Sequence, residues 1–63
     1  MNDAIAYTVE DAADAVGMSP RTIRRAVADG ELVQHIVKGS MPRILRSDLE
    51  AWIAAAPTER ASA

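Results

Sequence analysis

The chain has 63 residues, no cysteine and a formal net charge of −2, so it forms one small domain that neither disulfides nor a cysteine-based zinc site stabilises. Hydrophobic residues make up 49% of the sequence, but only Tyr7 and Trp52 are aromatic, which predicts a thin core. No stretch approaches the ~18 consecutive apolar residues of a membrane span, and the acidic start Met1-Asn2-Asp3 does not resemble a signal peptide. We therefore expect a cytoplasmic protein without a membrane partner.

The charges are unevenly distributed along the chain. Between Arg21 and Arg46, six basic residues accompany two acidic ones, whereas the rest of the chain carries one basic and seven acidic residues. This asymmetry predicts one positive face, of the kind that binds a polyanion such as DNA, and one negative face.

The first predicted helix begins after Thr8. Residues 1–6 show no periodicity, and we expect them to form a flexible leader. Thr8 is the expected N-cap, because its hydroxyl can accept a backbone N–H and acidic residues follow it at the positive end of the helix dipole. One apolar stripe then recurs with helical spacing: Val9, Ala12, Ala13 and Val16.

Residues 16–25 have the pattern of a helix-turn-helix. Gly17 is expected to end the first helix, because glycine readily takes the left-handed conformation that satisfies the final carbonyls. Ser19 is the expected N-cap of a second helix, and Pro20 occupies its first position, where no backbone N–H is needed.

We expect the second helix to cover residues 20–29 and to end at Gly30. Its buried stripe consists of Ile23, Ala26 and Val27. Its outward side carries cations and hydroxyls at an amino end that already favours an anion, so we predict contacts to DNA. The predicted contact residues of this helix are Ser19, Arg21, Thr22, Arg24 and Arg25. The alternative is that the arginines pair with nearby acidic residues and only solubilise the domain: Glu10, Asp14 or Asp29.

Two short extended runs follow, residues 32–37 and 43–46, joined by a turn-like segment over 38–42. They predict a β-hairpin wing, which is narrow enough to enter a DNA groove or to lie along the backbone. We expect the wing to pack on the helices through Leu32, Ile36 and Ile44 or Leu45. Its predicted DNA contacts are Lys38, Gly39, Ser40 and Arg43. His35, the only histidine, is expected to be an exposed strand residue, not a metal ligand.

The third predicted helix follows a capping-box pattern, with Ser47 as N-cap and Glu50 three positions later. Its apolar stripe consists of Leu49, Trp52, Ile53 and Ala56, and Pro57 ends it. We expect Trp52 to anchor this helix in the core, and residues 57–63 to form a flexible tail.

Four segments together resemble the excisionase-type, MerR-like winged helix-turn-helix domains. They are YTVEDAA (residues 7–13), GMSPRTI (17–23), GEL (30–32) and RSDLEAWI (46–53). The resemblance covers about residues 7–55 and implies a mostly α-helical domain over 7–56, in which two helices and a β-hairpin wing precede a third helix. It implies that the second helix enters the major groove and that the wing contacts the backbone or the minor groove. Residues 41–42, Met-Pro, depart from the polar, basic or aromatic residues that relatives often carry on the wing.

Small members of this family resemble recombination directionality factors of phages and other mobile elements. Such proteins bind repeated DNA sites side by side, bend the DNA and direct a partner integrase towards excision. The same surface also suits a small transcriptional regulator of a mobile element. A third interpretation is a protein-interaction module that docks through its acidic first helix and its alanine-rich third helix. With isolated glycines, no nucleophile–base pair and no metal cluster, the sequence predicts neither an enzyme nor a cofactor.

Overall fold

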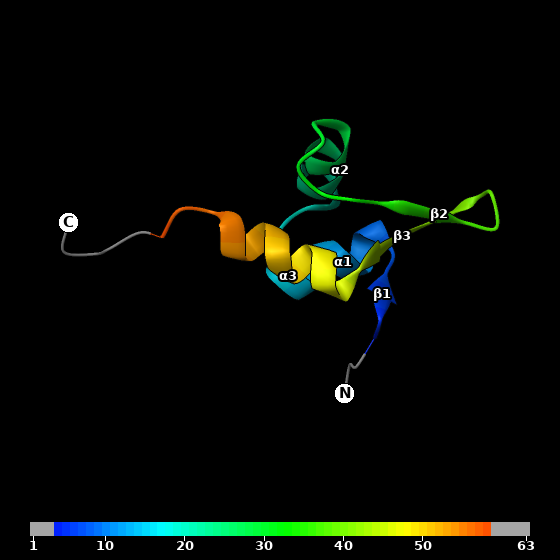
Figure 1. Cartoon of the computed structure of the whole chain (residues 1–63), viewed down its shortest axis with the longest axis horizontal. Coiled ribbons are helices and arrows are strands. Elements are labelled where there is room, and N and C mark those ends of the chain that lie inside the picture. The colour runs from blue at the N-terminus through cyan, green and yellow to red at the C-terminus, as the bar shows by residue number, and fades with distance from the viewer. Residues whose placement is uncertain (1–3, 59–63) are drawn as a thin grey trace.

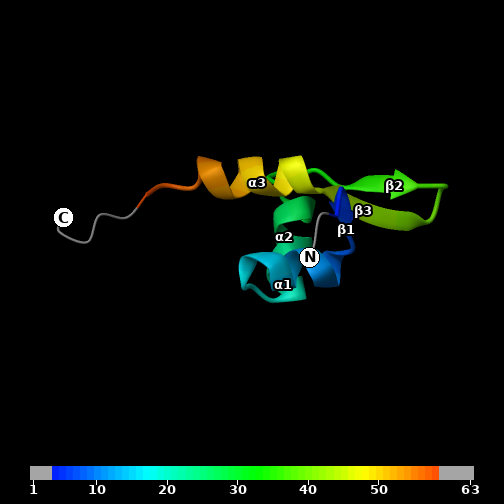
Figure 2. The ribbon, with the colours of Figure 1, turned by 90° about the horizontal axis from the view of Figure 1, so that it is seen from below.

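The computed structural model describes residues 4–58, which form a winged helix-turn-helix (Figure 1). In chain order the elements are β1 (Ala6–Tyr7), α1 (Val9–Val16), α2 (Pro20–Ala28), β2 (His35–Val37), β3 (Met41–Leu45) and α3 (Arg46–Ala55). The wing and α3 extend in opposite directions from the middle of the molecule, and α1 and α2 lie together on one side of them (Figure 2). The predicted fold class is confirmed.

The turn between α1 and α2 folds as predicted. The Oγ1 atom of Thr8 accepts a backbone N–H of the first turn of α1 at 3.1 Å, and Gly17 ends α1 with a φ of 71°. The Oγ atom of Ser19 accepts the backbone N–H of Thr22 at 3.2 Å, and Pro20 is the first residue of α2. Each of these interactions spans only a few residues, which is why the sequence pattern reveals them.

The three strands form one antiparallel sheet with the order β1-β3-β2. Strand β1 was not predicted, and its first residue, Ala6, belongs to the expected flexible leader. In β1, Ala6 pairs with Leu45 and Tyr7 pairs with Ile44. A strand of two residues carries no periodicity, so it depends on the free edge that β3 offers. Residues 1–3 of that leader lie outside the described residues, as do residues 59–63 of the expected tail.

The wing is shorter than predicted, with a tighter turn. Its first strand begins only at His35, and Met41 and Pro42 belong to β3, so the turn is reduced to residues 38–40. Pro42 is tolerated in β3 because β1 does not extend that far, and β3 is an edge strand on that side.

The predicted capping box of α3 is wrong. The helix begins at Arg46, directly after β3, with Leu45 as an N-cap that makes no side-chain hydrogen bond. The backbone N–H of Arg46 instead bonds to the carbonyl of Ile5 at 2.8 Å. Because the helix begins at Arg46, Ser47 lies inside its first turn and does not cap it. Glu50 accepts from Nε of Arg46 at 3.1 Å, and does not reach back to an N-cap.

The other end of α3 agrees with the sequence. Ala56 follows the last helical residue with φ −68° and ψ 148°. This is the extended conformation that a residue before proline prefers, so Pro57 ends the helix as predicted.

The core is small and gathers around the inner end of β3. Its buried residues are Val9, Ala12, Ala13, Ile23, Ala26, Leu32, Ile44 and Leu49. Ile23 and Ile44 are its largest fully buried side chains. Trp52 is only partly buried at the edge of this cluster and does not anchor its centre. Ile36 is 53% exposed and does not pack on the helices as predicted, because the wing projects past them.

Replacing a fully buried residue should therefore cost far more than replacing an exposed one of the same type. We expect Ile44→Ala to lower the free energy of unfolding by about 2–5 kcal/mol, because it removes transfer energy and leaves a cavity. Ile36→Ala, at an exposed position of the wing, should change it by less than ~0.5 kcal/mol. Urea unfolding followed by circular dichroism checks both values, and equal losses would contradict the core assignment.

Candidate nucleic-acid interface

The outward side of α2 carries exposed hydroxyl and guanidinium groups, from its N-cap Ser19 to Arg25 in its last turn. Its members, all exposed, are Ser19, Arg21, Thr22, Arg24 and Arg25. The hydroxyl oxygens of Ser19 and Thr22 lie 3.0 Å apart. The opposite side of α2 is held in the core by Ile23 and Ala26, so packing of the apolar side leaves the polar side facing solvent. The structure thus brings the predicted residues of α2 together on one surface.

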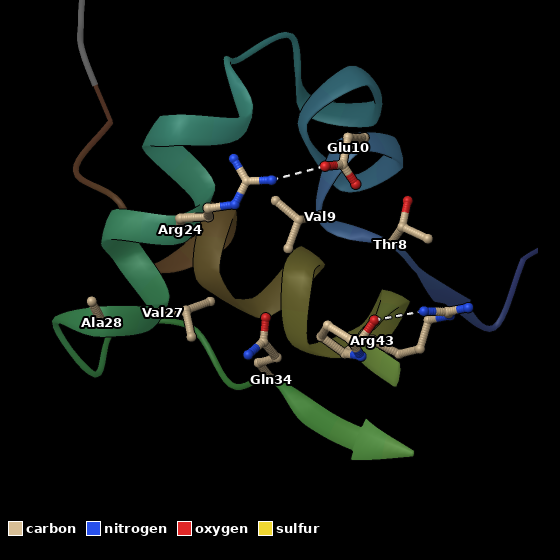
Figure 3. A pocket seen from close by; sticks show the side chains of 9 residues that line it. Thr8, Val9, Glu10, Arg24, Val27, Ala28, Gln34 and Arg43 are labelled. Carbon is tan, nitrogen blue, oxygen red and sulfur yellow. Dashed lines mark hydrogen bonds and ion pairs between the residues drawn. The ribbon is translucent and has the colours of Figure 1, made fainter. Parts of the chain in front are cut away.

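Arg24 differs from the other two arginines of α2. Its Nη2 atom donates to Oε2 of Glu10 in α1 at 2.8 Å, and the two side chains are 59% and 63% exposed (Figure 3). Within residues 4–58, the ion pairs include neither Arg21 nor Arg25. The alternative interpretation, in which the arginines of α2 pair with nearby acidic residues, therefore holds for Arg24. An exposed pair contributes only about 0–1 kcal/mol, so its main effect is to hold Arg24 towards α1.

A cleft of about 500 Å³ separates α2 from the base of the wing (Figure 3). Arg24 lines it from α2 and Arg43 lines it from β3, and Thr8 and Gln34 add polar groups. The Nη1 atom of Arg43 donates to the carbonyl of Pro42 at 2.8 Å, which restrains this side chain at the wing base. Arg24 and Arg43, 19 positions apart in the chain, therefore both line this cleft together with Glu10, and the guanidinium of Arg43 points away from Arg24 (Figure 3).

The turn of the wing has an unusual backbone. Lys38 and Gly39 both have positive φ, 54° and 80°, and the N–H of Ser40 bonds to the carbonyl of Val37 at 3.3 Å. Turns with positive φ at both central residues match the twist of a hairpin, although the left-handed region costs a residue such as lysine about 1–2 kcal/mol. Of the predicted wing residues, Lys38, Gly39 and Ser40 therefore lie at the tip of the wing. Arg43 lies in β3, at the base of the wing.

The family comparison agrees with this geometry. Residues 6–57 match a family model described as a helix-turn-helix domain. The chain belongs to this helix-turn-helix family. It is a family of DNA-binding domains that includes excisionase-like members, and its members are typically not enzymes. No curated protein and no solved structure matches the chain in the corresponding comparisons.

This helix-turn-helix domain separates its charges between two surfaces. The exposed acidic residues of α1 are Glu10, Asp11 and Asp14. By contrast, residues 32–46, which contain the whole wing, include no aspartate or glutamate. The overall negative charge therefore does not extend to the wing, and α2 itself has no acidic residue, although the exposed Asp29 caps its carboxyl end.

His35 occupies the exposed strand position that the sequence predicts. Its Nε2 atom lies 3.7 Å from Oδ2 of Asp48. Over residues 4–58, no group of three or more histidine, cysteine, aspartate or glutamate side chains is placed to hold a metal ion. Over the same residues, no helix combines the length and the apolar character needed to cross a membrane.

Sequence reasoning missed two contributors to the cleft, Thr8 and Gln34. For Glu10, the sequence predicted only that it was one of several acidic residues that could pair with the arginines. These residues reach the cleft through the packing of α1, α2 and the wing, and no local pattern marks them in the sequence.

The cap of α2 provides a stability test for this surface. Ser19→Ala should lower the free energy of unfolding by about 1 kcal/mol, because the N–H of Thr22 loses its side-chain acceptor. Ser19→Asp should preserve the stability, since aspartate caps a helix equally well. Ser40→Ala at the wing tip is the matched control, and thermal unfolding compares the three. A Ser19→Ala variant as stable as Ser40→Ala would show that the cap contributes nothing.

Proposed function

We propose that this helix-turn-helix domain is a sequence-specific, architectural DNA-binding protein of a phage or another mobile element. In this proposal it acts as an excisionase, which binds repeated sites, bends the DNA and directs an integrase towards excision. The observation that carries DNA binding is the exposed outward side of α2, which presents three arginines and two hydroxyls and begins at a capped amino end that favours an anion.

In the proposed complex, α2 lies in the major groove. An α-helix with its side chains is about 10–12 Å across, which suits a groove about 12 Å wide, and the nine residues of α2 extend about 13.5 Å along it. Ser19, Arg21 and Thr22 contact phosphates at the entry of the helix, and Arg25, one turn further, reaches a base edge. Arg24 exchanges Glu10 for a phosphate at the cleft.

The wing supplies the second set of proposed contacts. Lys38, Gly39 and Ser40 approach the DNA from the tip, and Arg43 contacts the phosphate backbone where it crosses the cleft between α2 and the wing. These contacts are electrostatic, so they strengthen binding to all sequences and make it depend on salt.

The distribution of charge supports the excisionase function. An acidic α1 and a wing without acidic residues lie on one small domain. Head-to-tail contacts between such unlike surfaces form open arrays along a duplex, and not closed two-fold dimers. Neighbouring copies on direct repeats can therefore attract one another.

A gel-shift titration tests the proposal on DNA that flanks the attachment site of the element, at two salt concentrations. We expect a ladder of successive bands that weakens as salt rises. One shifted species on a two-fold site would contradict the excisionase function and favour a transcriptional regulator. No shift at low salt would overturn DNA binding and favour a protein-interaction module.

Arg25 should determine specificity more than affinity. Bidentate pairing of a guanidinium with guanine discriminates against a wrong base by about 1–3 kcal/mol, so Arg25→Ala should relax the preference at one base position by that amount. Arg25→Lys is the control, because it keeps the charge without the planar donor pair. It should preserve the salt dependence and still lose the preference. Binding to a set of single-base variants measures both, and an equal loss on every sequence would make Arg25 a phosphate contact.

A further inference from the structure

The wing is apolar next to its turn, on both of its faces. Val37 and Met41 lie opposite each other and are 41% and 38% exposed. Ile36 lies opposite Pro42 and is 53% exposed. Because side chains alternate between the faces of a strand, the first pair lies on one face and the second pair on the other. Four apolar residues therefore surround the end of the hairpin.

Ile36, Val37 and Met41 belong neither to the core cluster of the described residues nor to the hydrophobic residues packed against it. The core cluster and the hydrophobic residues packed against it reach the wing only at its base, through Ile44. From there the hairpin projects away from all three helices in both views (Figures 1 and 2). Exposed apolar positions on a short hairpin favour aggregation unless they have a partner, so this pattern points to one.

The charges beside the apolar residues indicate what the partner carries. Lys38 lies at the tip, and Arg43 lies two residues from Met41 on the same face of β3. The wing has no carboxylate to balance them. The complementary surface is therefore apolar inside and negatively charged at its borders. The minor groove of DNA offers such a surface where a base step opens, because the faces of stacked bases are apolar and lie between two rows of phosphates.

The width of the hairpin, compared with that of the minor groove, determines where its tip can enter. Two paired strands lie about 4.8 Å apart before any side chain is counted, whereas the minor groove of B-DNA is about 6 Å wide. The tip can enter only where the groove widens, and apolar side chains placed between base steps widen it by unstacking the bases and kinking the duplex.

We propose that the wing tip is an apolar wedge, in which Val37 and Met41 enter the minor groove, separate one base step and bend the DNA towards the major groove. Lys38 and Arg43 hold the flanking phosphates. The proposal rests on the proposed DNA-binding function and deepens it, because it names the side chains that produce the bend.

The test uses the full chain and a single-site duplex that the protein itself selects from a random pool. The duplex carries 2-aminopurine at successive steps and a fluorophore pair at its ends. The wild type should brighten one 2-aminopurine position and bend the duplex by at least about 20°. Val37→Ser with Met41→Ser should still bind at low salt but lose the brightening and the bend, and Met41→Leu should keep both.

Lys38→Ala is the matched control at the tip, because it removes a charge and leaves the wedge. At saturating protein it should keep the bend, while the slope of log affinity against log salt falls by about 0.9. Circular dichroism of each variant confirms that the domain is folded.

The outcomes separate the wedge from the function on which it rests. If the wild type selects no duplex, DNA binding itself fails. If the wild type binds but neither bends nor unstacks the DNA, or if the double serine variant bends it as the wild type does, the wedge is overturned. Loss of cooperativity on a two-site duplex, with an unchanged bend on one site, would make the tip a contact between copies instead.

Discussion

The structure depends on the burial of one strand residue, Ile44. It lies at the inner end of β3, fully buried with Ile23 of α2, and it pairs with Tyr7 of β1. β3 is bonded on both sides and leads directly into α3. The packing of this position therefore fixes the inner end of the wing against α1 and α3. Ile23 and Ile44 are the largest fully buried side chains of residues 4–58, and Leu32 and Leu49 complete this small core at 3% and 4% exposure.

Placing the negative charge on α1 allows an acidic protein to present a basic surface. Among the ion pairs of residues 4–58, the one that joins α1 to α2 is between Glu10 and Arg24, and a pair so exposed is weak enough to exchange for a phosphate. The proposed affinity for DNA then comes from a few cations on α2 and the wing, while the remaining acidic surface weakens contacts away from the site. Such a balance favours binding that depends on sequence and on neighbouring copies.

The wing shows how the same segment contributes to the fold and, in our proposal, to bending. Its base belongs to the core through Ile44, whereas its end exposes apolar side chains that the domain does not cover. Pro42 fixes the φ angle of one residue of β3 between these regions, which restricts the hairpin there. A stiff hairpin anchored at its base can transmit force to a duplex, which a flexible loop cannot.

The sequence by itself determined the features that depend on neighbouring residues. The caps at Thr8 and Ser19, the left-handed Gly17 and the end of α3 before Pro57 all follow from contacts within a few positions. The side of α2 that faces solvent also follows, since helical periodicity alone assigns Ile23 to the core. The DNA contacts predicted for this surface remain predictions.

Only the tertiary structure decided the features that depend on distant residues. Strand β1 exists because β3 offers an edge, and α3 begins at Arg46 because the carbonyl of Ile5, 41 positions earlier, accepts its N–H. The partial burial of Trp52 and the exposure of Ile36 depend on how far the helices reach. Local patterns show that a residue is apolar and where it lies on its element, but the area that covers it is set by segments that fold against it from elsewhere in the chain.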